Sequence, residues 1–322
     1  METHECEGST HVQALRYIAE NGAENRVQIV AKGGVEAIVK ALQTHGWSEQ
    51  VQEQGCWALC RLAVGAENEV AIAAKGGIEA VMGAMQQHGT SEGVQVAGCR
   101  ALWGLAFNAE NKVAAKGGIE VVMGAMRDHE WSSAVQEHGC RALRNLARDQ
   151  QNQVAIAAKG GIEAVISAMA AHWSSVGVQE AGCGALFYLA ENEENRVMIA
   201  AKGGIEAVVW AMGAHKLKGG VQVKGCLALK QLAMNPENKL VIAAEGGIEA
   251  LVRAMGNHGS STLLQEQGCW ALENIAESDV RLQSQVREAG AVPFVEKALL
   301  RFPDKGDLQQ HGKGLLEKLG TC

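Results

Sequence analysis

One dipeptide recurs along this chain at a nearly fixed interval, and that interval constrains the fold more than any other feature. Gly-Cys occurs six times, with spacings of 43, 41, 43, 43 and 43 residues between its cysteines, Cys56, Cys99, Cys140, Cys183, Cys226 and Cys269. An Asn, a Gly-Gly pair and a His recur in the same register, as at Asn68, Gly76 and His88. Self-similarity at such a period is the signature of stacked supersecondary units. The chain is therefore predicted to be a repeat protein.

Each repeat contains three helical patterns. Pro occurs only three times in 322 residues, and the chain is rich in helix-forming residues, which predicts an all-α fold. In one unit a short segment runs from Asn68, whose side chain is expected to cap free N–H groups, to the Gly-Gly pair. Apolar stripes then predict a second helix before His88 and a third helix around Gly98 and Cys99. Helices of roughly 8, 11 and 14 residues cannot bury their apolar faces alone, so neighbouring repeats must supply the core.

One repeat is shorter than the others. The segment NKVAAKGG, which starts at Asn111, lacks two residues that are present in NEVAIAAKGG, which starts at Asn68. The deletion falls inside the predicted first helix of that unit. A local distortion between repeats is expected there.

The period, the Asn-led first helix, the GGIEAVV-type second helix and the GCWALCRLA-type third helix together resemble the armadillo-repeat family. The resemblance implies a right-handed superhelix of α-helices, an armadillo-repeat solenoid, with three helices in each repeat of roughly 43 residues. Residues 1–322 are predicted to form a single solenoid. Its expected parts are an N-terminal partial repeat consisting of a third helix only (9–22), six repeats (24–279) and a C-terminal capping repeat (280–322).

The recurring cysteines are interpreted as buried packing residues. Stacked helices lie about 10 Å apart, whereas a disulfide needs Cα atoms within about 7 Å. Cys56 and Cys60 form the one close pair along the sequence, and the terminal Cys6 and Cys322 are predicted to be exposed thiols. No metal site is predicted.

Three other recurring residue types have more than one interpretation. The His of each repeat is expected to cap the end of its own second helix, or alternatively to form a pH-responsive edge. Lys and Glu four residues apart, as in Lys75 and Glu79, predict a solvated edge of weak ion pairs. Trp47, Trp131 and Trp173 are predicted to lie in loops after second helices, where they pack loop on loop or form an edge for a partner.

Composition and motifs exclude several functional classes. The net charge of −7 argues against a general nucleic-acid or anionic-membrane binder. No apolar run is long enough to span a bilayer, and the N-terminus lacks the pattern of a secretory signal, so a cytoplasmic or nuclear location is expected. No catalytic or phosphate-binding motif is present, and no enzyme activity, membrane insertion or cofactor is predicted.

The resemblance also implies that third helices line a concave groove. In importin alpha an Asn ladder there holds an extended peptide, and each Asn accompanies a Trp four residues earlier. In this chain only Trp270 with Asn274 retains that pair. The groove is instead predicted to be basic and aromatic, and its candidate partner-binding residues are Trp57, Arg61, Arg100, Trp103, Arg141, Asn145, Tyr188, Lys224, Gln231, Trp270 and Asn274.

Three functions follow from this interpretation. The first is a non-enzymatic scaffold that binds a partner protein or an extended peptide in the groove. Because Arg and aromatic residues dominate there, the segment it binds is expected to be acidic with apolar anchors. The alternative is a structural subunit of a larger, multi-subunit complex that contacts partners by its edges and ends. A more remote alternative is an adaptor of the nuclear-import type.

Overall fold

The computed structural model describes residues 2–277 and 279–321, except for the side chains of residues 2–9, 11 and 110. The side chain of Cys6 and residue Cys322 therefore lie outside the described part. Regular secondary structure in the described residues is helical throughout, in three-helix repeats, which confirms the predicted all-α armadillo-type fold class. No single helix among these residues is long and apolar enough to cross a membrane.

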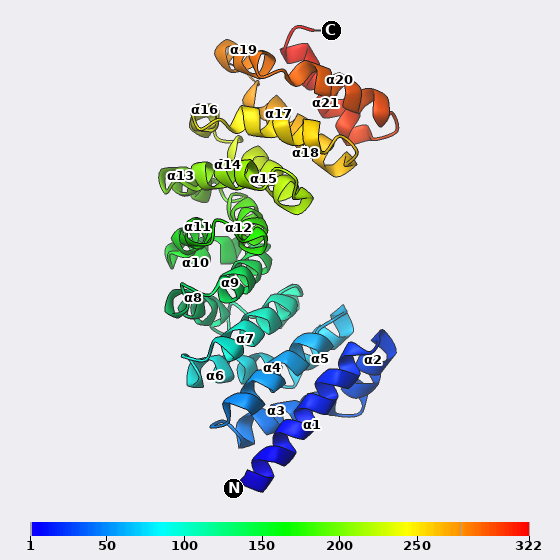
Figure 1. The fold of residues 1–322 in the computed structure, drawn as a ribbon, viewed down its shortest axis with the longest axis vertical. Helices are drawn as coiled ribbons and strands as arrows, with labels where there is room; N and C mark the ends of the chain where they lie inside the picture. The colour runs from blue at the N-terminus through cyan, green and yellow to red at the C-terminus, as the bar shows by residue number, and fades with distance from the viewer. Residues whose placement is uncertain (1, 278, 322) are drawn as a thin grey trace. The chain divides into compact units, whose positions relative to one another are not determined.

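The helices fall into three sets, one for each position in the repeat, and Figure 1 shows them in chain order. The third helices are α1 (Glu2–Glu20), α4 (Glu49–Leu62), α7 (Glu92–Leu105), α9 (Ser133–Leu146), α12 (Val176–Leu189), α15 (Gly219–Leu232), α18 (Thr262–Ile275) and α21 (Gly306–Lys318). The second helices are α3 (Gly34–Thr44), α6 (Gly77–Gln87), α8 (Gly118–Asp128), α11 (Gly161–Ala171), α14 (Gly204–Ala214), α17 (Gly247–Asn257) and α20 (Ala291–Arg301). The first helices are α2 (Ala23–Ala31), α5 (Ala66–Ala74), α10 (Gln150–Ala158), α13 (Glu193–Ala201), α16 (Pro236–Ala244) and α19 (Val280–Glu288).

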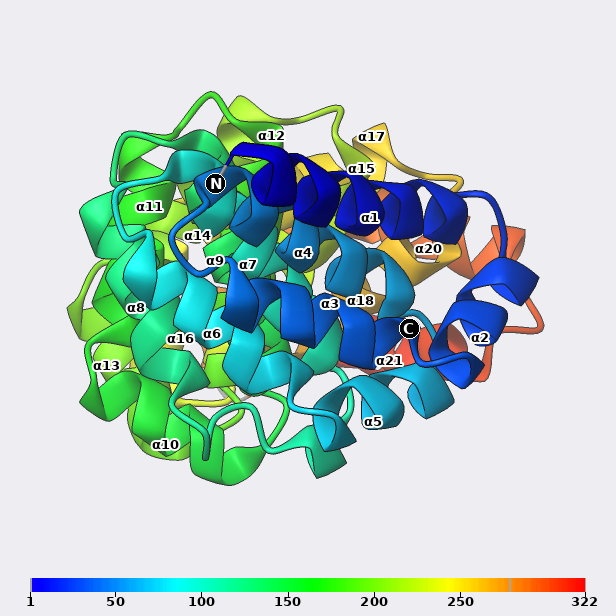
Figure 2. The ribbon, with the colours of Figure 1, turned by 90° about the horizontal axis from the view of Figure 1, so that it is seen from below.

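The chain divides into two compact units, Met1–Ala164 and Val165–Cys322, with the boundary inside α11. In the first unit, α1, α4, α7 and α9 contact one another in that order, and so do α3, α6 and α8 (Figure 2). In the second unit the corresponding series are α12, α15, α18 and α21, and α14, α17 and α20. The subdivision of the chain into a partial repeat, six repeats and a capping repeat stays a prediction.

The Gly-Cys dipeptide marks the closest approach of the second and third helices. A Cβ atom placed on Gly98 would lie 2.3 Å from Cγ of Met85, so the position requires a residue without a side chain. The adjacent Cys99 is fully buried, and burial raises the pKa of its thiol to about 12. All six cysteines of this dipeptide are buried, which confirms their predicted role as packing residues.

The recurring Asn does not cap the first helix as predicted. Helix α13 begins two residues before Asn195, and its N-cap is Asn192, whose side chain accepts from the N–H of Asn195. The side chain of Asn195 instead donates to the carbonyl oxygen of Leu189, 3.0 Å away, at the end of the preceding third helix. The terminal carbonyls of a helix lack intrahelical partners, so this Asn satisfies one of them.

The recurring His also has a different role from the predicted cap. Nε2 of His88 lies 2.7 Å from the carbonyl oxygen of Gly46, in the corresponding loop of the preceding repeat. The end of the second helix is capped by Gln95 of the third helix, whose Nε2 donates to the carbonyl oxygens of Met85 and His88. His88, His129, His215 and His258 each link neighbouring repeats in this way. The cap comes instead from a recurring Gln that the sequence analysis did not single out. That Gln recurs in the Gly-Cys register and was visible in the sequence as Gln52, Gln95, Gln136, Gln179, Gln222 and Gln265.

The Lys and Glu residues pair between repeats rather than within one turn. Lys116 bonds to Glu79 of the preceding repeat at 2.7 Å, and Lys159 bonds to Glu120 at 2.8 Å. The hydrogen bond from Lys159 lowers the pKa of the Glu120 carboxyl group. These groups are largely exposed, so each pair is still expected to contribute little to stability.

The loop tryptophans are mostly exposed. The side chain of Trp131 is 70% exposed and lies beside the ring of His129, and Trp47 lies beside His45. The ring of Trp173 contacts Trp210, which lies on the next second helix, α14. The exposure leaves the second interpretation, an edge for a partner, available for Trp47 and Trp131.

The two-residue deletion removes a helix. Where other repeats form a nine-residue first helix, this repeat has a short 3-10 helix, η1 (Ala109–Asn111), and Lys112 adopts a left-handed φ of 50°. A pocket of about 390 Å³ lies between this segment and the start of α10, lined in part by Phe107, Val113 and Arg148. The predicted distortion is thus confirmed at its predicted position.

This segment is expected to exchange its amide hydrogens faster than its counterpart in the preceding repeat. Residues 111–116 form the end of a short 3-10 helix and turns with scattered backbone hydrogen bonds, whereas residues 68–74 lie in the continuous helix α5, so local opening of 111–116 requires less free energy. We expect exchange at least about tenfold faster in 111–116, measured by native-state hydrogen–deuterium exchange with mass spectrometry. Equal protection of the two segments would contradict this assignment.

Candidate functional site

The third helices present a row of half-buried Arg and aromatic residues in each unit. Their positions follow from the repeat: residues one, four and five positions after the Gly-Cys cysteine lie mostly half-buried on the accessible side of the third helix, while the cysteine faces the core. Because the site residues occur in both units, each unit is described by itself.

In the first unit, Trp57 is surrounded by guanidinium groups from three consecutive third helices. The Cζ atoms of Arg16, Arg61 and Arg100 lie 5.2, 5.5 and 5.3 Å from the centre of its ring. Glu20 forms ion pairs with Arg16 and Arg61, at 3.3 and 3.0 Å. No described carboxylate is within ion-pairing distance of Arg100. Three like charges around one indole, with a single paired carboxylate, leave this position strongly electropositive.

The next two aromatic residues of this face also carry cations. Arg141 lies 5.4 Å from the ring of Trp103, and Arg148 lies 4.4 Å from the ring of Phe107. Asn145 occupies the position of the family's Asn ladder, but it is buried, and its Nδ2 donates to the carbonyl oxygen of Trp103 at 2.8 Å. One amide hydrogen of this Asn is therefore already used inside the stack.

Several of these residues line a pocket of about 700 Å³ in the first unit, at the C-terminal ends of its third helices. Its lining includes four guanidinium groups and two aromatic rings, from Arg26, Arg61, Arg100, Arg144, Trp103 and Phe107. Glu20 and Glu69 are the acidic lining residues, and burial raises the pKa of Glu69, which favours its neutral form. The pocket therefore has a net positive charge although the chain as a whole is acidic.

In the second unit, groups of the chain itself already contact the Trp–Asn pair that this sequence retains, Trp270 and Asn274. Nζ of Lys230 lies 4.0 Å from the centre of the Trp270 ring, and the His311 ring stacks on Trp270 at 4.1 Å. At these separations the two groups must use opposite faces of the indole. Asn274 donates to the backbone carbonyl of Lys230 at 3.2 Å, and the Lys230 ammonium donates to Gln267 at 2.9 Å. Burial lowers the pKa of Lys230.

The other predicted residues of this unit lie on α12 and α15. The rings of Tyr188 and Phe187 contact each other with centroids 4.7 Å apart, and both are half-buried. Lys224 and Gln231 are half-buried on α15. The structure thus brings Trp57, Arg61 and Arg100 together in one unit, and Trp270 and Asn274 together in the other.

The sequence analysis did not include Arg16, in the N-terminal partial repeat, among the candidate residues. Arg16 follows Val12 by four residues, as Arg144 follows Cys140, so the register places both at the same position of the third helix. This shared register position could have identified Arg16 from the sequence. The sequence analysis also missed His311, which lies in the last helix, α21, and reaches Trp270 and Glu273 across the stack.

A buried histidine lies between two arginines of this face. His138 is 8% exposed, and burial, together with the charges of Arg100 and Arg141, lowers its pKa to about 4. The folded state therefore holds His138 neutral. In the unfolded chain this His binds a proton below about pH 6.5, whereas in the folded chain it binds one only near pH 4. The free energy of unfolding therefore decreases as the pH falls from about 6.5 to about 4.

We expect the His138→Gln variant to lose less stability on acidification than the wild type. Gln occupies the same register position in two other repeats, as Gln54 and Gln267, so the substitution suits the helix. Urea unfolding gives the free energy of unfolding at pH 7 and at pH 4.5. Between these two values it should decrease by about 2 kcal/mol more in the wild type than in the variant. Identical losses would place the proton uptake elsewhere.

Comparisons with known proteins agree with the armadillo-type fold. A family model described as the LRRK2 ARM repeat matches residues 10–201, which is more than half of the chain. A second, described as the Armadillo/beta-catenin-like repeat, matches residues 235–277. The chain belongs to the armadillo-repeat family. Armadillo repeats generally serve as protein-interaction scaffolds without enzyme activity. A comparison with curated proteins found no match.

Solved structures with similar folds include two engineered proteins from a structural genomics consortium. One aligns with a TM-score of 0.80 at 29% identity, covering 96% of this chain and 74% of its own. The other aligns with a TM-score of 0.67 at 24% identity, covering 76% of this chain and 99% of its own. A chain from a study of a phosphorylation switch that controls the interaction between cadherin and beta-catenin aligns with a TM-score of 0.59 at 16% identity, covering 95% of this chain and 71% of its own. At that identity the likeness concerns the fold alone.

Proposed function

We propose that this protein is a non-enzymatic scaffold that binds an extended acidic segment of a partner protein on its third-helix face. The observation that carries the proposal is the cluster of Arg16, Arg61 and Arg100 around Trp57, beside a pocket of about 700 Å³. Guanidinium groups recognise carboxylates with paired hydrogen bonds, and adjacent rings accept apolar side chains. The partner's segment therefore carries Asp or Glu interleaved with bulky apolar residues.

The expected acidic charge of the partner's segment follows from the Arg and Lys side chains that already lie beside the aromatic rings of this face. Trp57, Trp103, Phe107, Phe187 and Trp270 each lie beside an Arg or Lys of this chain. A lysine of an incoming peptide would have to displace these cations, whereas a carboxylate would pair with them. Lys230 and His311 fill both faces of Trp270, which weighs against the lysine recognition that a nuclear-import adaptor needs.

An affinity pull-down from a native lysate, read by mass spectrometry, tests this function. The wild type is compared with a variant that carries Arg100→Glu, Arg141→Glu and Tyr188→Ala. Partners that bind the wild type and are lost from the variant are expected, and their shared segments should be acidic. Recovery of the same partners by both proteins would refute binding by this face.

The exposed tryptophans favour a second candidate, a structural subunit that contacts other proteins by its edges. Trp47 and Trp131 are 55% and 70% exposed on loops that follow second helices. Edge binding predicts that the groove variant keeps its partners while Trp131→Ser loses them, so the same pull-down separates the two candidates. For either candidate we propose a cytoplasmic or nuclear location.

A further inference from the structure

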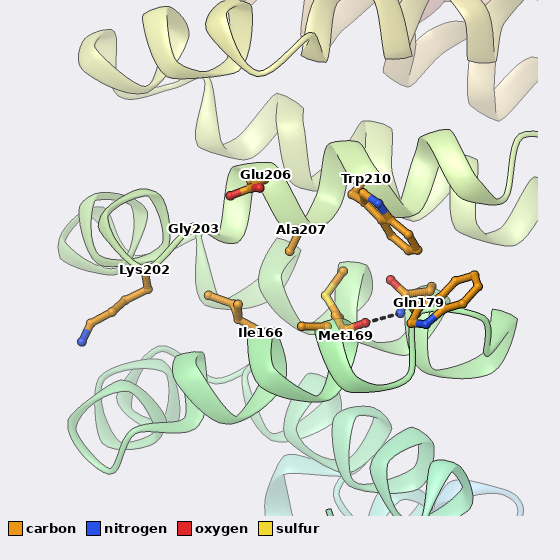
Figure 3. Close-up of a pocket in the computed structure, with 10 residues that line it drawn as sticks. Ile166, Met169, Gln179, Lys202, Gly203, Glu206, Ala207 and Trp210 are labelled. Atoms are coloured by element: carbon orange, nitrogen blue, oxygen red, sulfur yellow. Dashed lines mark hydrogen bonds between the residues drawn. The ribbon is translucent and has the colours of Figure 1, made fainter. Parts of the chain in front are cut away.

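The second unit contains a pocket on its second helices, on surfaces that the proposed function does not use. The pocket has a volume of about 510 Å³ and lies between α11 and α14. Ile166 and Met169 of α11 and Ala207 of α14 form apolar walls (Figure 3). Its size falls within the range of about 300–1,000 Å³ that is typical of small-molecule sites.

Two perpendicular indoles form one end of this pocket. The rings of Trp173 and Trp210 have centroids 5.8 Å apart and an interplanar angle of 89°. The carbonyl oxygen of Trp173 lies 2.9 Å from Nε2 of His215, so the recurring His holds the loop that carries this ring. The position of Trp210 holds Gly83, Gly124 or Ser167 in the three preceding repeats. The aromatic pair is therefore a local feature of this repeat and not part of the repeating framework.

A buried acceptor without a partner lies beside these rings. Gln179 is fully buried, and its Nε2 donates to the carbonyl oxygens of Met169 and His172 at 2.7 and 3.1 Å. Its Oε1 has no hydrogen-bond partner among the described residues. Figure 3 shows the Gln179 side chain between Met169 and Trp210, at the wall of the pocket. An unsatisfied buried carbonyl costs about 1–3 kcal/mol and is therefore unusual in a folded protein.

The charged residues of the pocket point away from this end. In Figure 3 the ammonium group of Lys202 and the carboxylate of Glu206 extend to the side opposite Trp210 and Gln179. The end that contains the two indoles and the orphan oxygen is therefore uncharged. A ligand group that fits there must be flat and apolar, with no net charge, and must supply one hydrogen-bond donor.

We propose that this pocket binds a neutral aromatic group that carries a single N–H or O–H donor, with indole as its simplest form. The ring stacks against Trp173 or Trp210, and its donor hydrogen bonds to Oε1 of Gln179. This site is independent of the third-helix face, because all its lining residues lie on the second helices, on the adjoining turns and at the start of α12.

The test compares 5-fluoroindole with its N-methyl derivative, which has nearly the same shape but no donor. Fluorine NMR titration of the full chain measures both affinities. We expect 5-fluoroindole to bind with a Kd of about 1 mM or tighter, and the N-methyl compound to bind at least about tenfold more weakly, because it leaves Oε1 unsatisfied. Equal binding of the two compounds, or no binding of 5-fluoroindole at several times that concentration, would overturn the proposal.

A variant localises the site. Trp210→Ser introduces the residue that the preceding repeat has at this position and is expected to abolish binding of 5-fluoroindole. The matched control, Trp131→Ser, removes an exposed Trp outside the pocket and should bind as the wild type does. Loss of binding in both variants, or in neither, would contradict the assignment to this pocket. A second titration uses a capped tryptophan tripeptide in place of indole. If the tripeptide binds more tightly than indole, the natural ligand is a side chain of a partner protein; if it binds more weakly, the natural ligand is a free small molecule.

Discussion

Replacing Cys183 with Glu is expected to unfold much of the second unit. Cys183 is fully buried in α12, and the adjacent Gly182 lies so close to Met169 that a Cβ atom there would be 2.4 Å from its Cγ. The larger, ionisable side chain has no room, and its carboxylate would be buried without a countercharge. Such substitutions cost about 3–5 kcal/mol. Because each repeat is stabilised by its neighbours, the loss should extend to the repeats stacked on α12.

Thermal unfolding followed by circular dichroism measures this effect. We expect Tm to fall by about 10 °C or more, with hydrogen exchange accelerated in residues 176–232. Cys183→Ala keeps the position apolar and should cost only about 1 kcal/mol, while Ser174→Glu places the same charge on an exposed loop residue and should leave Tm nearly unchanged. An unaltered Tm for Cys183→Glu would refute its role in holding the stack together.

The second large effect is expected from reversing two charges on the third-helix face. Arg100 and Arg141 lie beside Trp57 and Trp103, and no described carboxylate neutralises Arg100. Arg141 also forms an ion pair with Glu137 at 2.8 Å. In the Arg100→Glu/Arg141→Glu double variant, the attraction of Arg100 for an acidic segment becomes a repulsion, and the charge of Glu137 is no longer offset. We expect binding of a fluorescent probe peptide with alternating Asp and Phe residues to weaken by about 100-fold or more at low salt.

Fluorescence anisotropy measures this change, and a matched variant controls for net charge. Lys40→Glu/Arg127→Glu alters the net charge by the same amount at two exposed residues of the second helices α3 and α8. This variant is expected to weaken binding only slightly. For the wild type, affinity should also fall as salt is raised, because these contacts are partly exposed. If both double variants weaken binding equally, the probe responds to overall charge and not to this face.

The sequence predicted the repeating parts of this molecule well, because each of them depends on residues close together in the chain. The three helices of a repeat, the left-handed Gly at the end of the first helix and the buried cysteine all follow from local periodicity and backbone chemistry. Even the missing helix before Gly117 was visible as a two-residue deletion. Tertiary structure could not alter these features without exposing an apolar face.

The partners of individual side chains could not be predicted in the same way. Lys116 has Glu120 four residues ahead in sequence, yet it bonds to Glu79 of the preceding repeat, because stacking places the Lys of one repeat beside the Glu of the repeat before it. For the same reason the recurring His reaches a carbonyl about 42 residues away instead of the end of its own helix. In a repeat protein the same residue type recurs in every repeat, so the sequence offers each side chain one partner in its own repeat and an equivalent partner in the neighbouring repeat. The distance between stacked repeats decides which of the two is contacted.

The same distinction applies to the two candidate sites. By itself the sequence determined that Arg and aromatic residues would share the third-helix face, since the register assigns them to one side of each helix. Only the tertiary structure decided that Lys230 and His311 fill the faces of Trp270, and that Gln179 keeps an unpaired oxygen beside Trp173 and Trp210. Those outcomes depend on rotamers and distances between separate helices, which no spacing along the chain encodes.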